Sequence, residues 1–156
     1  MKKVFALFAI CTFLLTGCGD QEVSASLDNL PTVTTNQGEA PTIGAPAGNP
    51  PETLISKDII IGSGAEALAS STVSVHYTLM TWSNGQLIES SWNGGSPYTS
   101  PLSKLIVGWQ QGIPGMKVGG RRLLVIPPDL GYGAQGGGPI GPNETLIFVV
   151  DAIGVA

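Results

Sequence analysis

Apolar and polar residues alternate most regularly between Thr72 and Met80. Alternation with period two is typical of a strand that buries one face, because successive side chains of a strand point to opposite sides. The Asn84-Gly85 pair that follows tolerates positive φ, so it predicts a hairpin turn into a returning strand at Gln86–Ser90. One face of the first strand carries Val73, Val75, Tyr77 and Leu79, and the other carries Ser74, His76 and Thr78.

Two continuous apolar runs, Leu123–Ile126 and Leu146–Val150, predict strands at the centre of a sheet, where both faces are buried. Only the segment from Trp109 to Gly115 allows one or two turns of helix, which Gly112 and Pro114 would end. These elements predict an α+β domain, in which a strongly bent antiparallel β-sheet wraps on one short α-helix. The further extended segments are Leu54–Ile61, Pro97–Ser103, Arg121–Ile126 and Thr145–Ile153.

The beginning of the chain has a different pattern. Lys2 and Lys3 precede an apolar run from Val4 to Leu15, which is shorter than the roughly 20 residues that span a bilayer. This arrangement is typical of a secretory signal peptide, predicted here at residues 1–17. Leu15-Thr16-Gly17-Cys18 resembles the bacterial lipobox, which implies cleavage before Cys18 and lipid on its thiol. We therefore expect an extracytoplasmic lipoprotein anchored to the membrane of a bacterial cell envelope; the alternative is an ordinary secretory signal with an accidental cysteine.

The segment after Cys18 is rich in Gln, Ser, Thr, Asn, Ala, Gly and Pro, and no structural period survives in it. Such a segment cannot bury enough apolar surface to offset the entropy of ordering it. We therefore predict that residues 18–51 form a lipidated cysteine and a disordered tether, and that residues 52–156 form the folded domain. A partner-binding motif within the tether is the alternative.

Charge and cysteine content narrow the classes of partner. The whole chain has 7 Lys+Arg and 11 Asp+Glu, and loss of Lys2 and Lys3 leaves 5 cations and a charge of −6 (5 − 11). An acidic chain without a basic stripe argues against nucleic acid as a partner and leaves lipid on Cys18 as the means of membrane attachment. Cys11 is lost with the signal peptide, so no pair remains for a disulfide.

The sequence contains no recognisable reactive constellation. The one histidine, His76, has no second histidine or cysteine near it, and we expect it to be structural. The run Gly136–Gly138 lacks the Lys-Ser/Thr pair and the following helix of a phosphate loop, so it predicts a mobile loop instead. We therefore expect neither a metal nor a cofactor.

Six segments together cover essentially all of residues 54–153: Val75–Thr78, Gly85–Ser91, Ile106–Trp109, Gly112–Arg122, Ile126–Gly133 and Thr145–Phe148. They occur in the order seen in FKBP-type peptidyl-prolyl isomerases, and the chain resembles this family in its bacterial lipoprotein form. The resemblance implies a monomer that isomerises X-Pro bonds in exported proteins at the membrane surface. It implies proline-containing polypeptides and the macrolide inhibitors of the family as partners.

The resemblance also implies roles for single residues around a pocket for one proline ring. Trp109 matches the indole on which the ring stacks, and the Tyr132 hydroxyl and the Ile106 N–H match donors to substrate carbonyls. Glu89 stands where the family usually has an aspartate beside the twisting amide. The candidate catalytic residues are Tyr77, Glu89, Ile106, Trp109 and Tyr132, and the candidate substrate-binding residues are Ile88, Tyr98, Leu105, Ile140 and Phe148.

Three departures from the family pattern concern this pocket. Ile88 stands where phenylalanine is usual, Glu89 replaces aspartate, and the loop Trp92–Ser96 has no arginine to hold that carboxylate. These departures keep open the alternative of a proline-binding chaperone module with little or no turnover. A surface lipoprotein that uses the fold for adhesion is a further alternative.

Overall fold

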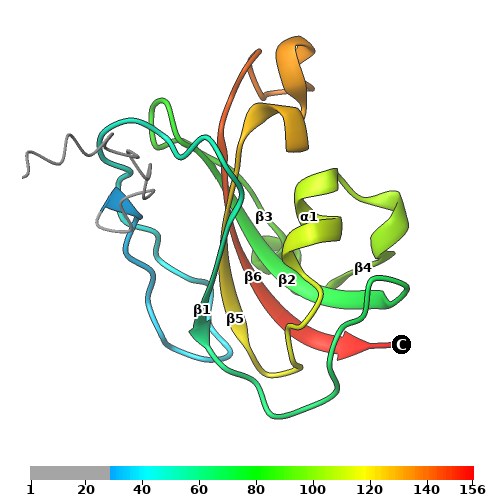
Figure 1. The fold of residues 1–156 in the computed structure, drawn as a ribbon. Coiled ribbons are helices and arrows are strands. Elements are labelled where there is room, and N and C mark those ends of the chain that lie inside the picture. Colours follow the sequence, from blue (N-terminus) through cyan, green and yellow to red (C-terminus); the bar gives the residue numbers. More distant parts are fainter. Residues whose placement is uncertain (1–28) are drawn as a thin grey trace, which may run out of the picture.

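The computed structural model of the protein describes residues 29–156, which form one antiparallel sheet of six strands with a short helix, α1 (Val107–Gly112), on one side (Figure 1). The strand order is β1-β5-β6-β2-β3, and β4 pairs with β2. The predicted α+β fold class is confirmed. The strands are β1 (Ile55–Ile60), β2 (Thr72–Thr81), β3 (Leu87–Ser90), β4 (Tyr98–Pro101), β5 (Arg121–Ile126) and β6 (Leu146–Val155).

The connections between strands contain four short 3-10 helices. Between β2 and β3, Asn84 shapes the turn with its side chain: its Oδ1 accepts from Thr81 Oγ1 at 2.6 Å and from the Gln86 N–H at 2.9 Å. Positive φ is needed only at Gly85, where it is 64°. The 3-10 helices are η2 (Ser91–Gly94), η3 (Leu102–Lys104), η4 (Pro128–Leu130) and η5 (Gly133–Gln135).

The two central strands, β5 and β6, bury both of their faces, as their continuous apolar runs predict. Side chains on the helix side, such as Leu124, Ile126 and Phe148, join a first cluster with Trp109 of α1. Alternate side chains point to the other side and form a second cluster, made of Met80, Trp82, Leu123, Val125, Ile147 and Val149. The sheet therefore needs a cover on each face.

Residues 29–51, called the strap below, cover the second cluster on the side of the sheet opposite to α1 (Figure 1). Leu30, Val33 and Ile43 pack against it, and Val33 and Ile43 form a β-bridge within the strap. The Trp82 indole N–H donates to Gly48 O at 3.2 Å. The prediction of a disordered tether is therefore wrong for residues 29–51, because the sheet supplies the apolar partners that the strap itself lacks. Residues 1–28, with the predicted signal peptide and the rest of the tether, lie outside the described residues.

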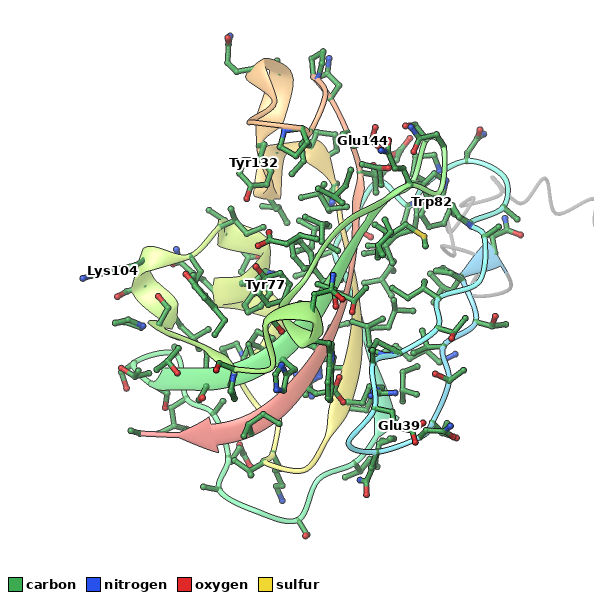
Figure 2. All side chains as sticks on the ribbon, turned by 180° about the vertical axis from the view of Figure 1, so that it is seen from behind. Glu39, Tyr77, Trp82, Lys104, Tyr132 and Glu144 are labelled. Carbon is green, nitrogen blue, oxygen red and sulfur yellow. The ribbon has the colours of Figure 1, made fainter. Side chains whose placement is uncertain are left out.

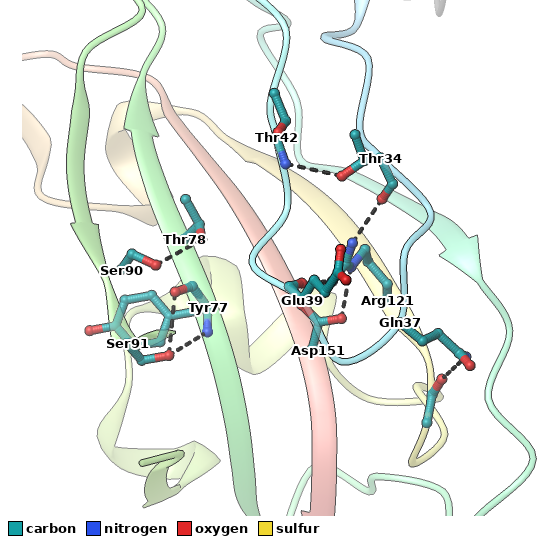
Figure 3. Close-up of polar contacts among 11 residues, drawn as sticks. Thr34, Gln37, Glu39, Thr42, Tyr77, Thr78, Ser90, Ser91, Arg121 and Asp151 are labelled. Carbon is teal, nitrogen blue, oxygen red and sulfur yellow. Dashed lines mark hydrogen bonds and ion pairs between the residues drawn. The ribbon is translucent and has the colours of Figure 1, made fainter. Parts of the chain in front are cut away.

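A buried charge joins the strap to the sheet (Figure 3). Arg121 is fully buried, and its Nε donates to Asp151 Oδ1 at 2.7 Å. Its two remaining nitrogens donate to strap carbonyls, those of Thr34 at 2.8 Å and Glu39 at 2.7 Å. A buried guanidinium must be paired and hydrogen-bonded to be tolerated, so the strap completes the coordination of this one.

No helix within residues 29–156 is both long enough and apolar enough to cross a membrane.

Candidate active site

Helix α1 lies directly on the sheet because it carries two glycines on the face that meets β5. A Cβ on Gly112 would lie 2.7 Å from Leu124 Cδ2, and a Cβ on Gly108 would clash with Ile126. Residues four apart share a face of a helix, so both glycines face the same strand. The close approach seats Trp109, which is 4% exposed, deep in the first cluster.

Arg122 fixes the other end of this helix. Its Nη1 donates to the carbonyl of Gly112 at 2.9 Å, and more weakly to those of Ile113 at 3.3 Å and Pro114 at 3.2 Å. A cation at a helix C-terminus satisfies carbonyls that have no partner within the helix and complements the helix dipole. Asp58 of β1 holds the same guanidinium through Nε at 2.6 Å and Nη2 at 3.0 Å.

Four aromatic rings meet above α1, with Tyr77 of β2 at the centre. Tyr77 meets Trp109 edge-on at 5.7 Å between ring centroids and Tyr98 edge-on at 5.8 Å. Phe148 of β6 lies 5.3 Å from Trp109, also edge-on. Edge-to-face contacts at these distances are the favoured geometry for aromatic pairs and hold the rings in fixed orientations.

These rings line an open pocket of about 110 Å³. The indole of Trp109 is its buried floor, whereas Tyr98 (42% exposed) and Tyr132 (41%) stand at its mouth. Figure 2 shows Tyr77 and Tyr132 on the side of the sheet away from Trp82 and the strap. The residues that line the pocket are Tyr77, Leu79, Glu89, Tyr98, Leu105, Ile106, Trp109, Tyr132 and Phe148.

Two hydrogen-bond donors, the Ile106 N–H and the Tyr132 hydroxyl, lie beside the apolar surface of the pocket. The Ile106 N–H, immediately before α1, makes no hydrogen bond to another group in residues 29–156. Its loop is held by Gln110, whose Nε2 donates to Leu105 O at 2.7 Å. The ring of Tyr132 rests on the backbone at Gly137, where a Cβ would lie 3.0 Å from the ring. The Gly136–Gly138 run is thus a tight turn behind Tyr132, closed by the bridge between Gly137 and Ile140.

Glu89 of β3 is the partner of the Tyr77 hydroxyl. Burial raises the pKa of Tyr77 far above its ordinary value of 10.0, and the hydrogen bond to Glu89 and the charge of Glu89 raise it further. The neighbouring hydroxyls of Tyr98 and Tyr132 act in the same direction. Tyr77 therefore remains a neutral donor at any physiological pH, and the Glu89 carboxylate stays at the wall of the pocket.

The loop Trp92–Ser96, which contains no arginine, is held by aromatic stacking rather than by an ion pair. The ring of Trp92 stacks on that of His76 at 4.1 Å with an interplanar angle of 19°. His76 Nδ1 lies 3.0 Å from Ser91 Oγ. Ser91 Oγ accepts from the Tyr77 N–H at 2.9 Å (Figure 3). His76 is thus a structural residue, as expected. Within residues 29–156, no three His, Cys, Asp or Glu side chains are grouped to hold a metal ion.

The structure brings eight of the ten candidate pocket residues together around this cavity. It places Ile88 and Ile140 elsewhere: both pack into the first cluster and neither lines the pocket. Sequence reasoning missed Leu79, which lines the pocket beside Tyr77. The alternation along β2 carried that signal, because Leu79 and Tyr77 share one face of the strand. The lipidation candidate Cys18 lies outside the described residues.

Every residue that lines the pocket falls within residues 64–153, which match the family model described as FKBP-type peptidyl-prolyl cis-trans isomerase. The chain belongs to this family. The aromatic pocket, with the free Ile106 N–H beside it, is the candidate active site of this FKBP-type isomerase. The family binds proline-containing peptides and FK506-type ligands.

Relatives of the FKBP family resemble the chain over most of their own length. A probable FK506-binding protein of Corynebacterium glutamicum is 49% identical over 115 residues, which cover 74% of this chain and 98% of that one. An FK506-binding protein of Streptomyces anulatus is 50% identical over 121 residues, with 75% and 98% covered. The crystal structure of AtFKBP13 superposes with a TM-score of 0.61 at 36% identity, over 69% of this chain and 96% of that one.

Proposed function

We propose that this FKBP-type isomerase catalyses cis–trans isomerisation of X-Pro bonds in exported proteins, at a membrane surface to which lipid on Cys18 holds it. The observation that carries the catalytic half of the proposal is the aromatic pocket with unused donors beside it. The basic residues, apolar run and lipobox-like segment of residues 1–18 support the anchoring half.

The chemistry requires little beyond such a pocket. An X-Pro bond interconverts in tens to hundreds of seconds because amide resonance is lost when the bond twists. The planar amide is more dipolar than the twisted one, so a site that is poor in water disfavours the planar ground state relative to the transition state. With the proline ring on Trp109, the amide would lie among Tyr77, Phe148 and Tyr98, whose rings exclude water.

Donors orient the chain on either side of the twisting bond. The Ile106 N–H and the Tyr132 hydroxyl are placed to donate to substrate carbonyls, and Tyr77 remains protonated under all physiological conditions. Fixing the flanking carbonyls lets rotation occur about one bond only, which removes part of the entropic barrier. The mechanism needs no nucleophile and no proton transfer.

The alternative is a proline-binding chaperone with little turnover, and one observation favours it. No cation among residues 29–156 forms an ion pair with Glu89. The Glu89 side chain, which forms part of the pocket wall beside the amide, is therefore held less rigidly than an ion pair would hold it.

The test measures isomerisation of a proline tetrapeptide by the mature protein in detergent, with and without FK506. Turnover that FK506 inhibits supports the proposal. FK506 binding without turnover selects the chaperone, and the absence of both overturns the proposal. For the anchor, Cys18→Ala should release the protein from the membrane fraction; retention there after cleavage of the signal peptide would show that Cys18 does not carry the anchor.

A further inference from the structure

Glu89 is the only charged residue among the nine that line the pocket. The ion pairs of residues 29–156 are Arg121 with Asp151 and Arg122 with Asp58, and Glu89 takes part in neither. Its partner is the neutral hydroxyl of Tyr77. The pocket therefore holds a negative charge that the described part of the protein does not neutralise.

No cation of the described residues forms an ion pair with Glu89. Lys57 lies on β1, at the opposite edge of the sheet from β3, which carries Glu89. Lys117 lies in the segment before β5 and forms a backbone bridge with Glu66. Lys104 directly precedes the pocket residue Leu105, but its side chain is exposed and points into solvent, away from Tyr77 (Figure 2). None of the three forms an ion pair within residues 29–156.

The surroundings of Glu89 favour a cation that comes with the substrate. The pocket is lined largely by aromatic and aliphatic side chains, and Glu89 is exposed, so a cation of the substrate can reach its carboxylate without being buried. Tyr98 and Tyr132 present partly exposed rings at the mouth. The aliphatic stem of a lysine or arginine can lie along such rings while its charged end reaches a carboxylate, and a guanidinium can also stack on them.

We propose that Glu89 is a specificity-determining residue that selects proline segments with a lysine or arginine next to the proline. This inference rests on the proposed function, because it requires a substrate whose proline ring sits on Trp109. Flanking side chains then cross the mouth of the pocket, where Glu89 stands. The expected order is arginine, then lysine, then neutral side chains, and finally glutamate, which the carboxylate repels.

The experiment compares tetrapeptides that differ only in the residue before the proline (Arg, Lys, Met, Gln or Glu), with a second series that varies the residue after it. The mature protein in detergent is assayed for kcat/KM and, by quenching of tryptophan fluorescence, for peptide affinity. We expect lysine to exceed methionine by about two- to fivefold at low ionic strength in at least one series, and the ratio to fall as salt is added.

The variant Glu89→Gln removes the charge and keeps the shape, so it should bring the Lys/Met ratio to about one. Asp129→Asn removes an equal charge from an exposed residue of η4 that does not line the pocket, and it should leave the ratio unchanged. A thermal melt of each variant shows that it is folded.

The outcomes distinguish a failure of this inference from a failure of the proposed function. Turnover without a basic preference, or a preference that survives in Glu89→Gln, overturns this inference and leaves the proposed function standing. Binding that prefers lysine without any turnover overturns the proposed function and supports the inference. Absence of both turnover and peptide binding overturns both.

Discussion

Arg121 and Asp151 face each other directly across β5 and β6, and the pair is buried under the strap rather than exposed at the surface of the sheet. Burial raises the pKa of Asp151 while the Arg121 guanidinium lowers it, and burial is the larger effect. The pair is thus costly to desolvate. The strap carbonyls of Thr34 and Glu39 take the remaining donors of the guanidinium, so the ion pair and the strap depend on each other.

Arg121→Met should lower the free energy of unfolding by about 3–5 kcal/mol, because it leaves Asp151 buried without a counter-charge. Urea denaturation at neutral pH measures this. In the double variant Arg121→Met with Asp151→Leu, no unpaired charge remains and much of the loss should be recovered. A loss below about 1 kcal/mol in the single variant would show that the pair is not buried as described.

Removing the strap should destabilise the domain, because the second cluster loses its cover. A chain that begins at Glu52 should unfold about 2–4 kcal/mol more easily than one that begins at Asn29, on the order of the burial of two or three aliphatic side chains. The exposed cluster, which includes Met80 and Trp82, should also promote aggregation. Equal denaturation midpoints for the two chains would contradict the strap's structural role.

Tyr77 should titrate far above the ordinary value of a tyrosine, because burial raises its pKa. All three tyrosines of the chain line the pocket, so an ultraviolet titration reports on it alone. Because the pKa of Tyr77 is raised on folding, its contribution to stability is present below about pH 10 and is lost as the pH rises through the folded value. In this titration, Tyr77→Phe should remove the ionisation step that occurs at high pH, and Glu89→Gln should move that step to lower pH. A titration in which no ionisation is delayed beyond the ordinary tyrosine pKa of 10.0 would contradict the burial of Tyr77.

Trp109→Ala should weaken binding of FK506 by about 2 kcal/mol or more, since a buried aromatic floor is the kind of residue that dominates binding energy. Tyr132→Phe should cost only about 0.5–1.5 kcal/mol, the worth of one hydrogen bond. Trp82→Phe is the matched control, because Trp82 belongs to the cluster on the other face of the sheet. Calorimetry measures all three, and unchanged affinity in Trp109→Ala would place the ligand elsewhere.

The strands and the pocket could be predicted from the sequence because both leave a periodic or ordered signal. The alternation in β2 and the continuous runs in β5 and β6 report directly which faces are buried. The lining residues Tyr77, Trp109, Tyr132 and Phe148 were found through the order of the family's segments, which fixes their positions in one domain.

The strap left no comparable signal. Its apolar residues Leu30, Val33 and Ile43 touch the sheet at single points, so no period arises along the chain. Arg121 binds it through backbone carbonyls, which every residue has, and these contacts put no constraint on residue type. The sequence also did not show which residues line the pocket: Ile88 precedes the pocket residue Glu89, yet it packs, partly buried, against the first cluster and does not line the pocket.

Ile88 is predicted to bind substrate at a position where the family usually has phenylalanine, and the structure instead packs it against the first cluster, outside the pocket lining. Ile88→Phe should therefore overfill the core and lower stability by about 1–3 kcal/mol, without raising kcat/KM on a proline peptide. Glu89→Asp, by contrast, withdraws the carboxylate from Tyr77 by about one C–C bond, roughly 1.5 Å, and alters the pocket itself. Steady-state kinetics and thermal melts on the two single variants separate these effects. Higher catalytic efficiency in Ile88→Phe would show that residue 88 shapes the pocket after all.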